Sequence, residues 1–144
     1  MTEIAFHFNA PDKVVHACRV ARKLLRQNKR LVVQVPPELM ESLDAMLWNM
    51  APHDFVAHCR AEDAPALLQA SPIVLTQDAR AMPHTEVLLN LGAEVPQGFS
   101  SYEQVIEVVD ATDESDRAAA RLRWKHYVQR GYALVRHDLV TGGV

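Results

Sequence analysis

The sequence predicts an α/β domain in which a mostly parallel sheet carries helices on both faces. Short β-branched runs bounded by proline or turn residues alternate with longer segments whose apolar residues recur every three or four positions. At 144 residues and 49% hydrophobic composition, the chain is long enough to bury one core. We therefore expect residues 1–144 to form a single domain.

The first half of the chain predicts two strands, each followed by a helix. Glu3–Phe8 is a β-prone run, and the turn after it ends at Asp12, a residue suited to cap a helix. Apolar residues keep helical spacing over Lys13–Asn28, while lysines and arginines occupy the other faces of that helix. Leu31–Val35 is the next expected strand, and a helix over Pro37–Asn49 follows.

The second half predicts further short strands and one long helix. The strand candidates are Phe55–Cys59, Ile73–Thr76, Glu86–Leu91 and Val105–Asp110. A helix over about Ser115–Arg130 begins after acidic residues and stops at Gly131, an order that suits the helix dipole. Residues 141–144 are expected to fray.

Charge is strongly segregated along the chain. Residues 11–30 hold seven Lys/Arg and one acid, residues 117–144 hold six and one, and the stretch from Glu38 to Asp116 holds fifteen acids and two bases. The overall net charge is −3, whereas a dedicated duplex-DNA binder is usually basic. We expect an acidic protein partner, with DNA contacted only indirectly.

The expected compartment is the cytoplasm. The chain lacks a run of about 18 apolar residues, so we expect no membrane partner.

Cys18 and Cys59 lie in apolar surroundings without CxxC spacing, which favours reduced, buried thiols. His53, Asp54, His58 and Cys59 offer metal-ligating side chains, but strand alternation sends the last two to opposite faces, so no metal is expected.

Enzyme chemistry finds little support. The turn after the first strand, Asn-Ala-Pro-Asp, lacks the glycines of a Rossmann or P-loop fingerprint, so the Rossmann-like arrangement comes without a nucleotide site, and no cofactor is expected. Asp110, Asp113, Glu114 and Asp116 are the best enzyme candidates, because clustered carboxylates hold Mg²⁺ in phosphotransferases and nucleases. Acids ahead of a helix also cap it, which explains the cluster without a metal.

The long C-terminal helix carries the most distinctive pattern. Arg117, Arg121 and Lys125 recur every four residues, and with Trp124 they project within an arc of about 100°. The like charges repel, and no acid after Asp116 interleaves to relieve them. Such a face suits a peptide with acids, an apolar residue and a free carboxylate, although a solvated face with Trp124 packed on the sheet explains the spacing equally well.

A second aromatic pair, Trp48 and Phe55, flanks the turn after the second helix. Core packing is the usual fate of such residues. A tryptophan at a helix end beside a polar, proline-containing loop is also typical of an interface. The sequence leaves both interpretations open.

The segments FHFNAPDKVVHACRVARKLL, QNKRLVVQV, LDAMLWNMAPHDFVAH and RLRWKHYVQRGY resemble the chi subunit of bacterial DNA polymerase III over nearly the whole chain. The resemblance implies a non-catalytic adaptor in a nucleotidyltransferase assembly at the replisome. The resemblance also implies that the chain binds the acidic C-terminal tail of single-stranded-DNA-binding protein and is tied through the psi subunit to the clamp loader.

By position, the resemblance assigns Arg117, Arg121, Trp124 and Lys125 to tail binding, and Trp48 and Phe55 to psi. Trp124 stands where a tyrosine is common, and residues 60–72 follow the family pattern poorly. The second partner stays open between a diverged psi, another part of the clamp loader and a helicase.

Overall fold

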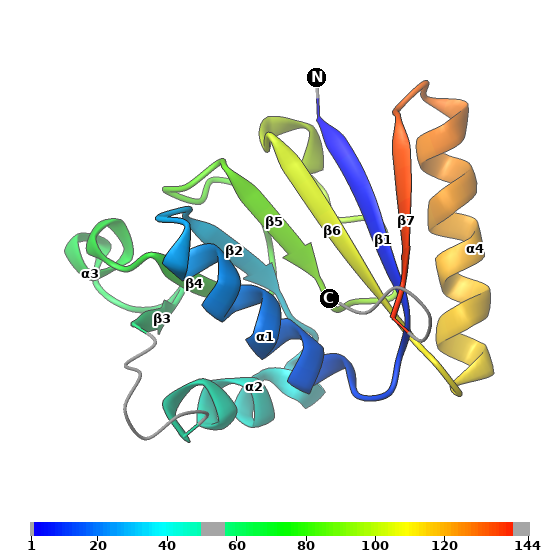
Figure 1. Ribbon diagram of the computed structural model, residues 1–144. Helices are drawn as coiled ribbons and strands as arrows, with labels where there is room; N and C mark the ends of the chain where they lie inside the picture. Colours follow the sequence, from blue (N-terminus) through cyan, green and yellow to red (C-terminus); the bar gives the residue numbers. More distant parts are fainter. Residues whose placement is uncertain (1, 50–56, 140–144) are drawn as a thin grey trace.

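The computed structural model describes residues 2–49 and 57–139, which form one wholly parallel sheet of seven strands (Figure 1). The strand order across the sheet is β3-β4-β2-β5-β6-β1-β7. In chain order the strands are β1 (Glu3–Ala10), β2 (Leu31–Gln34), β3 (His58–Arg60), β4 (Ile73–Thr76), β5 (Val87–Asn90), β6 (Gln104–Asp110) and β7 (Leu134–Asp138). The expected parallel α/β fold is confirmed.

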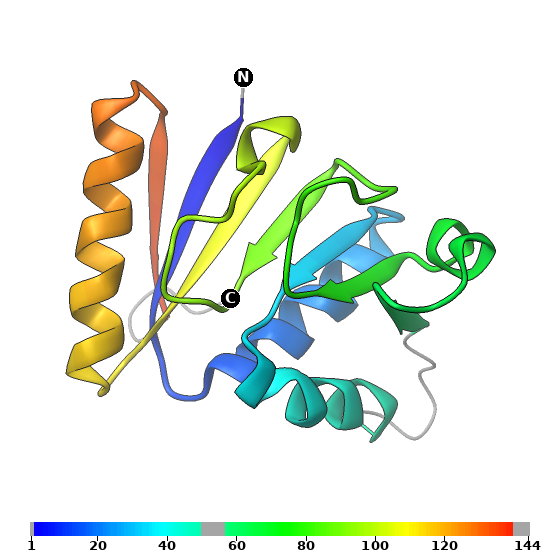
Figure 2. The same ribbon diagram turned by 180° about the vertical axis from the view of Figure 1, so that it is seen from behind.

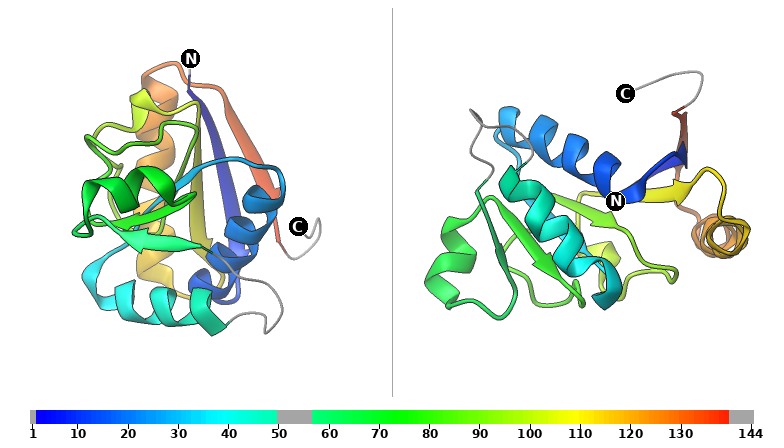
Figure 3. Two further views of the ribbon diagram at one scale, coloured as in Figure 1. Left: turned by 90° about the vertical axis from the view of Figure 1, so that its left-hand side faces the viewer. Right: turned by 90° about the horizontal axis from the view of Figure 1, so that it is seen from below.

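Helices cover both faces of the sheet, as expected. They are α1 (Lys13–Arg26), α2 (Pro37–Asn49), the short α3 (Pro65–Ala70) and α4 (Glu114–Gln129), with a 3₁₀ turn, η1 (Phe99–Ser101), between β5 and β6. One core cluster joins α1 and α2 to the face seen in Figure 1, and a second joins α4 and the β5–β6 connection to the face seen in Figure 2. Figure 3 shows strands lying between α1 and α4.

The helix starts follow the expected caps. The Asp12 carboxylate accepts hydrogen bonds from the amides of Val14 and Val15, and Asp113 accepts them from Ser115 and Asp116. These bonds satisfy amides that have no partner inside a helix. Each cap therefore sets the first turn of its helix.

Sequence reasoning missed α3 and β7. The six residues of α3 bury no side chain, so no apolar stripe marks it. Strand β7 lies at the sheet edge, pairs only with β1 among the described strands, and leaves most of its residues exposed. Without a buried face, LVRHD lacks the alternation by which strands are recognised.

Both cysteines are buried and free of disulfides, as expected. Burial raises the pKa of Cys18 to about 12, with a smaller contribution from Asp12. Burial likewise raises the pKa of Cys59. Both side chains are therefore thiols at neutral pH and act as small apolar residues.

None of the helices in the described ranges is long and apolar enough to cross a membrane.

Candidate functional site

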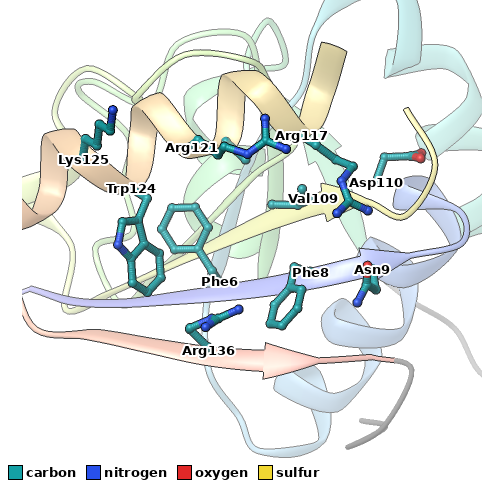
Figure 4. A pocket seen from close by; sticks show the side chains of 11 residues that line it. Phe6, Phe8, Asn9, Val109, Asp110, Arg117, Arg121, Trp124, Lys125 and Arg136 are labelled. Atoms are coloured by element: carbon teal, nitrogen blue, oxygen red, sulfur yellow. The ribbon is translucent and has the colours of Figure 1, made fainter. Parts of the chain in front are cut away.

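A pocket of about 460 Å³ opens between α4 and the edge of the sheet formed by β6, β1 and β7 (Figure 4). It brings together Arg117, Arg121, Trp124 and Lys125, the four residues that the sequence singled out on this helix. The rest of its lining comes from strands and from the inner side of α4: Phe6, Phe8, Asn9, Val109, Asp110, Ala120 and Arg136.

Aromatic rings form the apolar part of the pocket. The Trp124 ring meets Phe6 edge-on, with 5.1 Å between ring centroids, and Phe8 lies further along β1 (Figure 4). Trp124 is half-buried, so it packs on the sheet and still lines the pocket. Packing of Trp124 on the sheet is therefore observed, and its place in the pocket lining leaves peptide binding as a prediction.

A bulge in β1 changes which residues of the strand face the pocket and which face α1. The register with β6 shifts between His7 and Ala10, and Asn9 takes a left-handed conformation with φ of 65°. Asparagine tolerates this conformation better than most residues. Phe8 lies on the same face as Phe6, two residues before it, whereas the bulge turns Ala10, two residues after it, into the core beneath α1.

The cations of α4 have an acidic neighbour that the sequence did not reveal. A Glu114 carboxylate oxygen accepts a hydrogen bond of 3.0 Å from the Arg121 guanidinium, and the other oxygen lies 3.8 Å from Nε of Arg117. Arg117 also donates to the carbonyl of Ala111 at 2.8 Å. The expectation that no acid relieves these charges considered only residues after Asp116, and Glu114 at the start of the helix relieves them.

Arg136 of β7 adds a cation from the other side of the pocket. Its guanidinium carbon lies 4.8 Å from the Phe8 ring centroid and 5.9 Å from that of Trp124. Figure 4 shows Phe6 and Phe8 between this residue and α4. Sequence reasoning missed Arg136 because it assigned no strand there, so nothing placed the residue beside β1.

A buried ion pair anchors α4 to the sheet. Nε of Arg123, 2% exposed, donates to Glu107 of β6, fully buried, at 2.9 Å. The same carboxylate accepts from Asn90 at 2.9 Å and from the Tyr127 hydroxyl at 2.7 Å. Because Arg123 points inward, the rotation of α4 is set, and Arg117, Arg121 and Lys125 face the pocket.

The carboxylates that suggested an enzyme have structural partners. The Asp110 carboxylate accepts hydrogen bonds from the amides of Thr112 and Asp113, and the Asp113 carboxylate caps α4. The Asp116 carboxylate accepts a hydrogen bond from the amide of Asp110 and forms an ion pair of 3.0 Å with Lys13. Burial opposes ionisation of Asp110, but the hydrogen bonds from Thr112 and Asp113 outweigh it and lower its pKa. No cluster suited to a metal ion occurs in residues 2–49 and 57–139.

The second predicted surface lies at the opposite edge of the sheet, beside β3 (Figure 1). Trp48 at the end of α2 is 54% exposed, and its ring lies 4.6 Å from that of His58. The Asp44 carboxylate is hydrogen-bonded to Nε2 of His58 at 2.6 Å and to Nε of Arg60 at 2.7 Å. These bonds hold α2 against β3. Trp48 is therefore a surface residue, whereas Phe55 lies outside the described residues.

Fold and site together define a small parallel α/β domain with a cationic, aromatic-walled pocket at one edge of its sheet. The family model described as DNA polymerase III chi subunit, HolC, matches residues 1–135. The chain is 33% identical to the DNA polymerase III subunit chi of Pseudomonas aeruginosa over 125 residues, which cover 85% of this chain and 84% of that protein. It is 28% identical to the protein of that name from Haemophilus influenzae over 120 residues, 82% and 81% of the two chains. The chain belongs to the DNA polymerase III chi subunit family. Chi is an accessory subunit of this polymerase in DNA replication.

Proposed function

We propose that this chain is a non-catalytic adaptor that links the replicase to single-stranded-DNA-binding protein. In this proposal the pocket beside α4 binds the acidic C-terminal tail of that protein. Arg121 and Lys125 pair with tail carboxylates, with Arg117 as a third cation, and Trp124 contacts the apolar end of the tail. The observation that carries the proposal is one pocket that combines cations of α4 with the rings of Phe6, Phe8 and Trp124.

The chemistry supports a weak, salt-sensitive complex. Arginines bind carboxylates through paired hydrogen bonds, and aromatic walls accommodate an apolar side chain. A flexible tail loses entropy on binding, and exposed charges are screened beyond about 8 Å at physiological ionic strength. We expect micromolar affinity that falls as salt rises, with several tails on one oligomer compensating through effective concentration.

A second partner would use the other edge of the sheet. Trp48 is exposed beside β3, while the pocket lies beside β7, so the two surfaces are at opposite ends of the strand order. Two partners bound there would not compete for the same surface. This arrangement supports a link to the clamp loader through psi, through another subunit, or to a helicase.

Calorimetry at low salt with a peptide of the tail sequence tests the proposal. Arg121→Ala removes a pocket cation, and Arg130→Ala removes an exposed cation from the end of the same helix outside the pocket lining. We expect Arg121→Ala to weaken binding by about tenfold or more, since a charge-assisted hydrogen bond contributes about 1.5–3 kcal/mol. Arg130→Ala should bind like wild type. Equal binding by all three proteins would show that the pocket is assigned wrongly.

A further inference from the structure

We propose that Arg136 of β7 determines specificity in this pocket by binding the free α-carboxylate at the end of the peptide. The inference rests on the proposed function. It assigns the internal acids of the peptide to the cations of α4 and its terminal carboxylate to the opposite wall.

The first reason is the setting of the Arg136 guanidinium. It lies over the Phe8 ring at 4.8 Å and within 5.9 Å of the Trp124 ring. Contact with two ring systems restricts the side chain before a ligand arrives, so less rotamer freedom is lost on binding. A planar guanidinium held in this way can present two parallel N–H donors to a carboxylate.

The second reason is the availability of its charge. Arg117 and Arg121 share Glu114, and Arg117 also donates to the backbone at Ala111. In the described part of the chain, Arg136 contacts aromatic rings and makes no ion pair. An incoming carboxylate therefore displaces nothing from Arg136, whereas at Arg117 and Arg121 it competes with Glu114.

The third reason is the place of Arg136 relative to the apolar walls. Phe8 and Trp124, the rings that contact its guanidinium, also line the pocket that would take an apolar side chain (Figure 4). In the last residue of a peptide, the side chain and the α-carboxylate leave the same Cα atom. A terminal apolar residue seated against these rings thus brings its carboxylate to the Arg136 side of the pocket.

The test compares the tail peptide with a free carboxyl end and the same peptide with a C-terminal amide. Fluorescence anisotropy would be measured for wild type, Arg136→Gln and the control Arg130→Gln. Wild type and the control should prefer the free acid by about tenfold, the size expected for one charge-assisted pair. Arg136→Gln should bind the free acid as weakly as the amide, while its affinity for the amide changes less than about twofold, because only the terminal contact is lost.

Two results would overturn the inference and leave the adaptor proposal intact. One is tight binding by wild type with no preference for the free acid, and the other is an equal preference in Arg136→Gln. If wild type bound neither peptide, the proposed function itself would fail, and this inference with it.

Discussion

The Glu107–Arg123 pair is the residue-scale feature on which the site depends most. Both side chains are almost fully buried, so each charge relies on the other. We predict that Glu107→Leu lowers the free energy of unfolding by about 3–5 kcal/mol, the cost of leaving one partner of a buried pair uncompensated. Urea denaturation measures this loss.

Removing both charges supplies the matched control. In Glu107→Leu with Arg123→Met no buried charge is left unpaired, so we expect the double variant to be more stable than Glu107→Leu alone. Strictly additive losses in the two single variants and the double variant would show that the pair does not act as a unit.

Two buried histidines make stability depend on pH. Nδ1 of His7 lies 2.9 Å from Nε2 of His16, so one nitrogen must accept and cannot carry a proton. Burial lowers the pKa of His7 from 6.5 to about 4, helped by His16, His137 and Lys23, and burial with Arg19 lowers the pKa of His16 to about 4. Well above pH 6.5 both rings are neutral in the folded and the unfolded chain.

Between pH 6.5 and about 4, the unfolded chain binds protons that the folded chain does not, so the free energy of unfolding falls. We predict a loss of roughly 4 kcal/mol between pH 7 and pH 5 for the wild type, about 2 kcal/mol from each ring. Denaturation curves of His16→Gln should show a smaller loss over the same range, because one buried ring is gone. The same pH dependence in both proteins would contradict this account.

At the scale of elements, α4 depends on its cap. The Asp113 carboxylate accepts from the amides of Ser115 and Asp116. Asp113→Ala should lower the free energy of unfolding by about 1 kcal/mol. Asp113→Asn should lower it much less, because asparagine caps a helix equally well. Thermal denaturation of both variants tests this, and equal losses would mean that the charge, and not the cap, is what matters.

The same helix carries an acid that would compete with the proposed peptide for its cations. Glu114 pairs with Arg121 at 3.0 Å on an exposed surface, and a bound peptide carboxylate would have to replace it. We predict that Glu114→Gln tightens peptide binding by up to about fivefold, because exposed ion pairs contribute about 0.2–1 kcal/mol. Glu62→Gln, an exposed acid near β3, controls for net charge. Equal tightening in both variants on titration would assign the effect to long-range charge.

Sequence periodicity predicted the helices that bury an apolar stripe or begin at a clear cap. The expected helix over Ser115–Arg130 and the observed α4, Glu114–Gln129, differ by one residue at each end. Its pocket-facing side followed from the spacing of Arg117, Arg121 and Lys125 alone. The sequence places Glu114 in an acidic cluster that suits a Mg²⁺ site or a helix cap. Its pairing with Arg121 could not be predicted, because side-chain rotamers decide which charges meet.

At the scale of the whole molecule, the strand order sets which residues lie beside β1, and local sequence patterns do not predict this order. The first and last strands of the chain lie side by side, and this pairing brings Phe8 and Arg136 together. Phe6 and Phe8 read as ordinary core residues in the sequence, since nothing local reveals which strands flank β1. Half of the pocket was therefore predictable from one helix, and the other half arises from long-range pairing.

The same strand order separates the two candidate surfaces, with the pocket at the β7 edge and Trp48 at the β3 edge. An adaptor needs this separation, because each partner must bind without displacing the other. Binding of the tail peptide should therefore leave the α2–β3 edge unchanged.

Nuclear magnetic resonance tests the central claim most directly, by titrating the tail peptide into the ¹⁵N-labelled protein at low salt. We predict that amide shifts concentrate in the first three turns of α4, at Phe6–Asn9 and around Arg136, and that the indole signal of Trp124 moves while that of Trp48 does not. Shifts centred on α2 and β3, or no shifts at all, would contradict the assignment of the pocket as the peptide site.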